Sequence, residues 1–220
     1  GVYSKISAGY YRQTGEEEKM QPCGLTLNFT KNAYDTYKWL VDWMIDAGVW
    51  DYVYNTGSGE YRRRGTLEYI NKPERNKVGH LVSQISLVTL TPWYREETLT
   101  GAGTVSVSAG GQIASAVKIV TTGTSLVNPY ISMAANGEEF ARCEISMNVS
   151  TSSSLEYSNF YDDSHIIGVI NGVRTSLIEN LTARHNIYGH RFGAYTVNLS
   201  DSNGASPAIS VTVRKYWRTV

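Results

Sequence analysis

Residues Gly65–Glu97 read GTLEYINKPERNKVGHLVSQISLVTLTPWYREE, and the rest of the chain is organised around this stretch. Two runs with a strand-like pattern, Gly65–Ile70 and Leu81–Leu90, flank a polar segment, Asn71–Gly79. This segment contains proline, asparagine and glycine, which favour turns over regular elements. We therefore predict two β-strands joined by a turn-rich connection.

The second of these strands leads directly into Pro92, Trp93 and Tyr94. Proline lacks a backbone N–H and fixes its own φ, so the strand is expected to stop there. The residues that follow, Thr98–Gly111, are poor in charge and rich in Gly, Ser and Thr. We interpret Pro92, Trp93 and Tyr94 as the domain junction and Thr98–Gly103 as a hinge. The predicted domains are 1–98 and 99–220.

Composition limits the classes of function. The chain has 220 residues, a formal net charge of zero and 41% hydrophobic residues, which is enough to build a core. A neutral chain has no general attraction to nucleic acid or to an anionic membrane, and no apolar run is long enough to span a bilayer. We expect no membrane partner and no sequence-specific nucleic-acid partner. Cys23 and Cys143 lie far apart in the sequence, which favours buried free thiols over a disulfide.

One segment, Asn32–Asp46, has the pattern of an amphipathic helix. Asn32 is the expected N-cap with Asp35 as its capping-box partner, and Gly48 is placed to end the helix. Apolar side chains recur at helical spacing and form one stripe, which consists of Ala33, Tyr34, Tyr37, Leu40, Val41, Met44 and Ile45. Trp39 and Trp43 fall on a different face. We expect a loop of the same domain or a neighbouring subunit to cover that face, because exposed tryptophan pairs are costly.

A hairpin is expected directly after the helix. Its strands are Trp50–Tyr54 and Glu60–Ile70, joined by the residues Asn55–Gly59. Three consecutive arginines, Arg62–Arg64, lie on the second strand. Because side chains alternate along a strand, we expect them to be solvated or salt-bridged rather than to form one nucleic-acid patch.

The second half of the chain has only β patterns. Short alternating runs are separated by turn signals such as Asn128-Pro129, Asn136-Gly137 and Asn203-Gly204. The predicted strands are 104–108, 116–120, 130–133, 143–149, 166–170, 195–199 and 209–215. The predicted fold class is therefore an α+β N-terminal domain, with antiparallel strands, one helix and a β-hairpin, followed by an all-β antiparallel sandwich.

No pattern in the sequence predicts an enzyme. His185 and His190 lack a third ligand at a familiar zinc spacing, and the adjacent carboxylates Glu138-Glu139 and Asp162-Asp163 lie on turns rather than across a cleft. We expect no catalytic, cofactor-binding or metal-binding residues. The alternative is a carbohydrate-binding β-sandwich module. Its candidate residues are Tyr157, Tyr161, Tyr188 and Trp217, with His185, Asn186 and Arg191.

Several of these segments together resemble the distal tail protein (Dit) family of long-tailed phages. The most specific piece is Leu90-Thr91-Pro92-Trp93-Tyr94, preceded by the Gly79-His80-Leu81-Val82 opening of its strand. The helix with Ala33-Tyr34-Asp35-Thr36-Tyr37 lies where that family has its helix. Further matching segments are Val117-Lys118-Ile119, Asn128-Pro129-Tyr130-Ile131, Ile167-Gly168-Val169-Ile170-Asn171-Gly172 and Phe192-Gly193-Ala194-Tyr195-Thr196-Val197. The resemblance covers the chain from about Leu25 to its end.

This resemblance implies a structural role in the virion, at the phage tail tip, after assembly in the host cytoplasm. Family members form a hexameric ring, built by the N-terminal domain, and carry a galectin-like sandwich outside it. The implied partners are the tail tube protein, a tail-associated or fibre protein, and receptor-binding or baseplate proteins. The expected subunit-interface residues are Trp39, Trp43, Trp50, Tyr61 and Arg63, because a ring needs two different complementary patches on each subunit. The family has more N-terminal strand sequence before the helix, so we expect a shortened N-terminus or a reduced first sheet.

Overall fold

The structure is a computed structural model that describes residues 10–13, 16–19, 23–71, 78–108, 110–123, 125–149, 154–170, 172–184 and 193–218. The chain divides into two compact units, Gly1–Trp93 (unit 1) and Tyr94–Val220 (unit 2). The predicted fold class, α+β in the first part and all-β in the second, is confirmed. The alternation of Val2, Ser4 and Ile6 predicts a strand over Val2–Tyr11, and most of this range lies outside the described residues. A short hairpin, β1 (Tyr10–Gln13) and β2 (Glu16–Lys19), pairs in antiparallel fashion.

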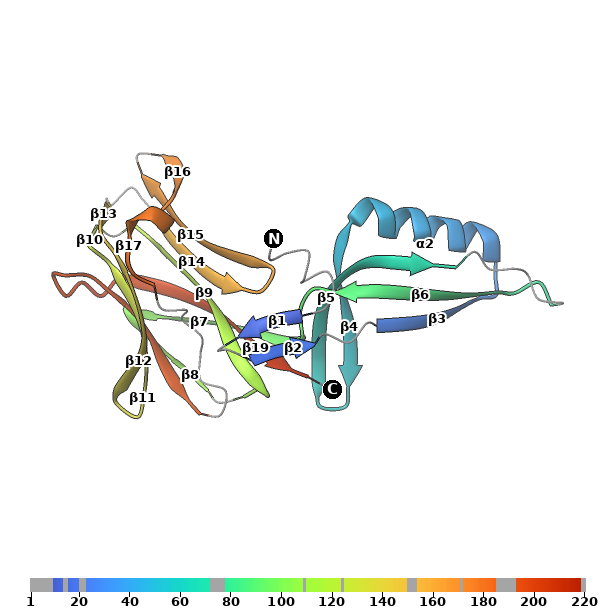
Figure 1. The fold of residues 1–220 in the computed structure, drawn as a ribbon, viewed down its shortest axis with the longest axis horizontal. Helices are drawn as coiled ribbons and strands as arrows, with labels where there is room; N and C mark the ends of the chain where they lie inside the picture. Colours follow the sequence, from blue (N-terminus) through green and yellow to red (C-terminus); the bar gives the residue numbers. More distant parts are fainter. Residues whose placement is uncertain are drawn as a thin grey trace. The chain divides into compact units, whose positions relative to one another are not determined.

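Unit 1 is a sheet with a helix on one face (Figure 1). Its strands are β3 (Cys23–Phe29), β4 (Val49–Thr56), β5 (Gly59–Ile70) and β6 (Leu81–Thr89), all antiparallel in the order β4-β5-β6-β3. The helix α2 (Ala33–Ala47) packs on this sheet through two small clusters centred on Phe29, Ala33 and Leu81, and on Met44, Ile85 and Leu87. The core of unit 1 is therefore one helix face against one sheet face.

Two details of the helix differ from the prediction. Asn32 has a left-handed backbone, with φ 44°, and its side chain makes no capping hydrogen bond, so the predicted capping box is wrong. The helix begins instead where this left-handed residue turns the chain, and it ends as predicted at Gly48, whose φ is 64°. Tyr34 and Ile45 are exposed. The buried or half-buried members of the predicted apolar stripe are therefore Ala33, Tyr37, Leu40, Val41 and Met44.

Unit 2 is a sandwich of two antiparallel sheets. One contains β7 (Trp93–Ala102, of which Trp93 belongs to unit 1), β9 (Ile113–Thr122), β14 (Ser154–Phe160), β15 (Asp163–Ile170), β16 (Val173–Ser176) and β19 (Ala208–Trp217), in the order β16-β15-β14-β9-β19-β7. The other contains β8 (Thr104–Val107), β11 (Tyr130–Ala135), β12 (Glu138–Ile145), β17 (Leu181–Arg184) and β18 (Tyr195–Ser200), in the order β17-β12-β11-β18-β8. A short pair, β10 (Leu126–Val127) with β13 (Asn148–Val149), and a 3-10 turn, η1 (Ile178–Asn180), complete the unit.

The sandwich core lies between the two sheets. Alternate residues of the central strands point inward, including Val117 and Ile119 from β9 and Ile131 and Met133 from β11. A second, smaller cluster contains Tyr94, Ile113, Ala116, Phe160 and Tyr216. The predicted hinge at Thr98–Gly103 is wrong, because residues 98–102 belong to β7, and the predicted boundary between residues 98 and 99 falls inside this strand.

Candidate interaction surfaces

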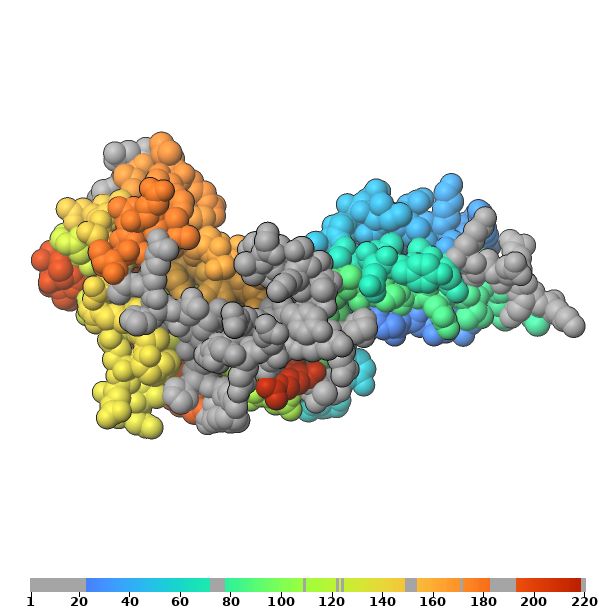
Figure 2. All heavy atoms as spheres, viewed as in Figure 1, coloured from blue at the N-terminus to red at the C-terminus, as the bar shows by residue number. Residues whose placement is uncertain are grey.

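Helix α2 presents two kinds of surface to solvent. Its buried side holds Ala33 and Met44, whereas Trp39 and Trp43 are 64% and 45% exposed. These two tryptophans are four residues apart and therefore lie on the same flank of the helix. The helix forms the outer surface of unit 1, in blue in Figure 2. No described loop of the chain covers this flank, so Trp39 and Trp43 form an apolar surface patch.

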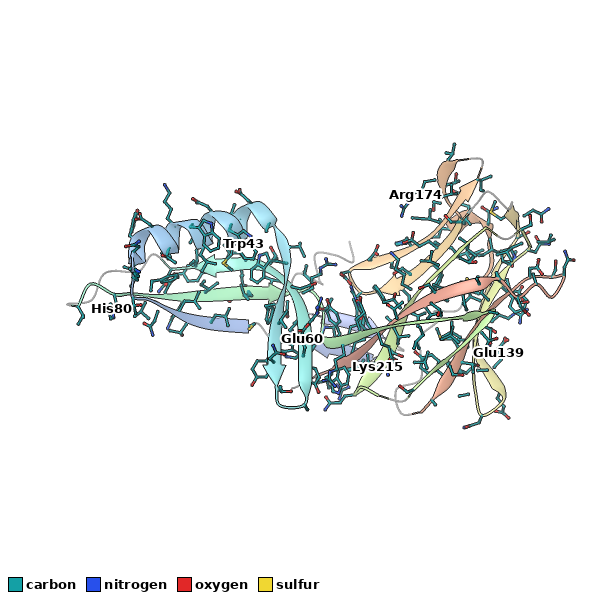
Figure 3. All side chains as sticks on the ribbon, turned by 180° about the vertical axis from the view of Figure 1, so that it is seen from behind. Trp43, Glu60, His80, Glu139, Arg174 and Lys215 are labelled. Carbon is teal, nitrogen blue, oxygen red and sulfur yellow. The ribbon has the colours of Figure 1, made fainter. Side chains whose placement is uncertain are left out.

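The helix flank continues into the β4–β5 hairpin through aromatic contacts. Trp43, labelled in Figure 3, lies with its ring centroid 5.9 Å from that of Trp50. Trp50 lies 6.2 Å from Tyr52, and Tyr52 lies 5.3 Å from Trp93 in an edge-to-face arrangement. The ring centroid of Tyr54 lies 6.0 Å from that of Trp93, so Trp93 contacts both Tyr52 and Tyr54. Edge and tilted contacts of this kind stabilise beyond the apolar area that they bury.

Arg63 holds this aromatic row in place from inside unit 1. Its side chain is buried, Nε donates to the carbonyl oxygen of Thr91 at 3.1 Å, and Nη2 donates to Oγ1 of Thr89 at 3.1 Å. The guanidinium carbon lies 5.6 Å from the ring centroid of Trp93. Burial raises the pKa of the neighbouring Tyr52 phenol well above its ordinary range. Arg63 therefore links the hairpin to the segment before Trp93, and any contribution to an interface acts through the position of the hairpin.

The two neighbouring arginines lie on the opposite face of the hairpin. Arg62 contacts Glu60 at 2.8 Å and Arg64 contacts Asp51 at 3.4 Å. In the strand register, Arg63 is paired with Tyr52, whereas Arg62 and Arg64 are paired with Val53 and Asp51. This confirms the prediction that the three arginines alternate and do not make one basic patch, and Arg62 and Arg64 form the expected salt bridges. Arg63 is buried rather than solvated.

Four of the five predicted interface residues lie in one row that runs from α2 to the end of the β4–β5 hairpin. Trp39 and Trp43 are exposed on α2, Trp50 is half-buried beneath Trp43, and Tyr61 is half-buried and paired with Tyr54 at the far end of the hairpin. Arg63 alone is buried. The interface role of these five residues stays a prediction. Sequence reasoning missed Tyr52 and Tyr54, although their alternation with Trp50 on a predicted strand was the available signal.

Exposed apolar side chains are concentrated in unit 1. Among the described residues, fourteen large hydrophobic side chains are exposed, and only three of them, Phe140, Val173 and Ile178, belong to unit 2. The others belong to unit 1: Leu25, Tyr34, Trp39, Trp43, Ile45, Val49, Val53, Tyr54, Tyr69, Val78 and Val82. Such a concentration is typical of surfaces that are buried against other protein chains.

The predicted junction residues Trp93 and Tyr94 make contacts in different units. Pro92 is buried, and Trp93 packs on Tyr52 and Tyr54 within unit 1. Tyr94 is 1% exposed in the second cluster of unit 2, 6.1 Å from Tyr216. The two consecutive aromatic side chains thus pack in different units.

The ring of Tyr94 also packs against the guanidinium of Arg214 in unit 2. The guanidinium carbon of Arg214 lies 4.6 Å from the ring centroid of Tyr94 and 4.0 Å from that of Phe160. Arg214 donates through Nε to Glu96 at 2.9 Å and through Nη1 to Asp162 at 2.7 Å. Its charge is therefore fully compensated inside the unit, which makes it a structural residue.

One polar cluster of unit 2 is centred on His165. His165 lies between Asp163 Oδ1 at 2.8 Å and Glu156 Oε1 at 2.9 Å, and Lys118 Nζ is 2.5 Å from the same Glu156 oxygen. The Lys118 ammonium, together with His165, lowers the pKa of Glu156. Among the described residues no group of three His, Cys, Asp or Glu side chains is placed to hold a metal ion. His185 and His190 lie outside the described residues.

The aromatic residues expected for a carbohydrate module are only partly placed. Tyr157 packs against the sandwich core, and Tyr161 packs on Tyr216 with ring centroids 4.9 Å apart. Trp217 is half-buried at the end of β19. Tyr188, His185, Asn186 and Arg191 lie outside the described residues. The predicted sugar platform is therefore not assembled in the part of unit 2 that the structure describes.

Three comparisons place the chain among known proteins. No protein-family model matches it, and no curated protein matches its sequence. It is similar in structure to a chain of the phage p2 baseplate in its activated conformation with calcium, with TM-score 0.61, 12% identity, and coverage of 96% of this chain and 86% of that one. The same baseplate with strontium gives TM-score 0.61, 13% identity and the same coverage.

A third similar structure is the SPP1 Dit protein, described as a paradigm of the hub adsorption apparatus in phages that infect Gram-positive bacteria. The TM-score is 0.60 at 10% identity, with coverage of 94% of this chain and 86% of that one. At these identities the likeness establishes the fold, and the predicted resemblance to Dit proteins is confirmed at that level. Among the described residues, no helix is long and apolar enough to cross a membrane.

Proposed function

We propose that the chain is a structural protein of the phage virion, located at the tail tip, where it forms a hexameric ring between the tail tube and the baseplate. The observation that carries this proposal is the concentration of exposed apolar side chains in unit 1. A monomer that left this surface in water would be prone to non-specific association. The fold shared with the phage p2 baseplate chain and the SPP1 Dit protein supports the same role.

Unit 1 offers the two different patches that a closed ring requires. One is the α2 flank with Trp39 and Trp43, and the other is the face of the β4–β5 hairpin on which Val49 and Val53 are exposed. A heterologous contact between such patches repeats around an axis and closes when the rotation between subunits is right. We therefore propose that the flank of one subunit contacts the hairpin of the next.

The open face of the sheet in unit 1 supports a position around an aqueous channel. The helix covers one face. The other carries polar side chains such as Thr26, Asn28, Gln84 and Glu68, together with the exposed side chains of Val82 and Tyr69. Glu68 accepts a hydrogen bond from Ser86 on this face at 2.7 Å. A polar face can remain hydrated in a ring, whereas the apolar flanks are buried between subunits.

The proposed partners are the tail tube protein, a tail-associated or fibre protein, and receptor-binding or baseplate proteins, with assembly in the host cytoplasm. Unit 2, whose exposed face is mostly polar, is proposed to lie outside the ring and to anchor such partners. Enzyme activity is not part of this role.

The test is the mass of the purified chain by light scattering across a range of protein concentrations, followed by negative-stain images of the largest species. We expect a species of six chains with an open centre. A chain that stays monomeric at every concentration, both alone and with its tail tube protein, would overturn the proposal of a ring.

A further inference from the structure

The outer face of the second sheet of unit 2 carries a polar side-chain group that the proposed ring does not use. Tyr130 of β11 is paired with Glu144 of β12, so their side chains project from the same face, and Arg142 lies two residues from Glu144 on that face. The alternate residues Ile131 and Cys143 are buried in the sandwich core. Tyr130, Arg142 and Glu144 are therefore directed away from the core.

Arg142 is held rigidly within this group. Its Nε donates to Glu144 Oε1 at 2.6 Å and its Nη1 donates to Glu139 Oε2 at 3.2 Å. The guanidinium carbon lies 3.9 Å from the ring centroid of Tyr130, above the ring face. Glu139 lies at the tip of the β11–β12 hairpin and is labelled in Figure 3. A side chain fixed by two carboxylates and a ring loses little further entropy when a ligand binds to it.

A hollow of about 300 Å³ lies beside this group. Its wall includes Tyr130, Arg142 and Glu144, and its rim includes the exposed residues Asn128, Thr182 and Ser202. This volume is at the lower end of the roughly 300–1,000 Å³ that small-molecule sites have. The hollow therefore has room for one small ligand unit that keeps part of its surface in water.

The charges of the hollow exclude two ligand classes. The guanidinium of Arg142 is already compensated by Glu139 and Glu144, which leaves an excess of negative charge and disfavours an anion. The same guanidinium occupies the position between the two carboxylates that a metal ion would need. A neutral ligand remains, and it must both donate to carboxylate oxygens and accept from N–H groups.

We propose that this hollow binds a neutral pyranose sugar. Adjacent sugar hydroxyls donate to Glu144 and accept from the N–H bonds of Arg142 that the two glutamates do not use. The hydroxyls of Thr182 and Ser202 and the amide of Asn128 lie at the rim for further hydrogen bonds. Because the hollow is half-open and takes one sugar unit, the expected Kd is on the order of millimolar.

The test is saturation-transfer difference NMR on the full chain, which reports weak binding whether the chain is a monomer or a ring. The probes are the methyl glycosides of glucose, galactose, mannose and N-acetylglucosamine, each at about 10 mM, well above a millimolar Kd. We expect saturation transfer to at least one of them. Replacing Arg142 by Ala is expected to weaken binding roughly tenfold, which is the effect of losing a charged hydrogen-bonding partner.

Two further variants make the result specific. Glu144→Gln keeps the shape of the side chain and is expected to weaken binding even if Arg142→Ala disturbs the strand pair. Arg174→Ala removes another sandwich arginine, one that contacts Glu156 at 3.6 Å on the other sheet, and should leave binding unchanged. No transfer to any glycoside would overturn the proposal, and so would transfer that survives both Arg142→Ala and Glu144→Gln. These outcomes do not depend on whether the ring forms.

Discussion

Trp43 of α2 and Trp50 of β4 lie with their ring centroids 5.9 Å apart, at an interplanar angle of 37°. This contact joins the exposed flank of the helix to the aromatic face of the hairpin. Trp43 is 45% exposed, whereas Trp50 is half-buried, and its indole Nε1 is buried without a hydrogen-bond partner. The pair therefore forms the transition between the surface of unit 1 and its core.

Replacing Trp39 and Trp43 together by Ser is expected to prevent ring closure. Both rings are substantially exposed in the single chain, so their loss removes an intersubunit contact while the core of unit 1 remains largely intact. The measurement is mass by light scattering, together with the thermal midpoint of the monomer. The control is Val173→Ser with Ile178→Ser, which removes two exposed side chains from unit 2. A full ring formed by the tryptophan variant would contradict the role of this flank.

The strands of the chain that alternate regularly were predictable. β3, β18 and the first part of β19 place apolar residues at every second position, and the Asn136-Gly137 turn has the positive φ values, 54° and 84°, that its residue types favour. The Trp50–Ile70 hairpin was predicted for the same reason. Its turn is shorter than expected, because the strands extend to Thr56 and Gly59.

Elements whose buried positions are polar were not predictable. β14 was missed because Asn159 is buried in it, where its side-chain oxygen accepts from the backbone N–H of Val117 at 2.6 Å. The second half of β7 was read as a hinge from its Gly and Thr content, although Leu99 packs against the sandwich core. In both cases contacts between distant segments override the local composition.

The candidate sites show the same limit. The exposed tryptophans of α2 followed from helical spacing alone. The burial of Arg63 did not, because it depends on Thr89 and Thr91, which lie on another strand end. The group of Tyr130, Arg142 and Glu144 could not be predicted from the sequence either, because it depends on the register between β11 and β12.

Arg63→Ala is expected to destabilise unit 1 by about 3 kcal/mol, because it leaves buried acceptors of Thr89 and Thr91 without their charged donor. Arg63→Lys should recover little of this, because an ammonium cannot reproduce the planar geometry of the guanidinium. The measurement is urea unfolding followed by tryptophan fluorescence. The neighbouring Arg62→Ala removes an exposed ion pair with Glu60 and should cost less than about 1 kcal/mol. Equal effects of Arg62→Ala and Arg63→Ala would argue against the buried linkage.

Asp201 makes the stability of unit 2 depend on pH. Its carboxylate accepts from the backbone N–H groups of Val127, Asn203 and Ala205 at 2.8–2.9 Å, and these bonds, that of Val127 first, lower its pKa. A lowered folded pKa means that the stabilisation is present above the unfolded pKa, near 3.9, and is lost as the pH falls through the folded value. Asp201→Ala should therefore cost about 2 kcal/mol or more at pH 7.

The measurement for Asp201 is the difference in urea midpoint between the native chain and Asp201→Ala at about pH 7 and about pH 3. The difference should shrink at the lower pH. Glu156 also has a lowered pKa, but it is present in both proteins, so its effect cancels in the difference. A difference that stays constant with pH would show that the carboxylate charge is not what Asp201 contributes.

Gly65 marks the place where β5 passes closest to β6. A Cβ at this position would lie 2.9 Å from the backbone oxygen of Val88 and 3.5 Å from the Tyr52 ring. The backbone of β6 cannot move away without breaking its own pairing, so Gly65→Ala is expected to destabilise unit 1 by about 2–3 kcal/mol. Gly24 on β3 is the matched control, because a Cβ there meets nothing within 4 Å, and Gly24→Ala should change stability by less than about 1 kcal/mol. Urea unfolding of the two variants, followed by tryptophan fluorescence, measures both effects. If Gly65→Ala proves as stable as Gly24→Ala, the close approach of β5 to β6 does not limit this position.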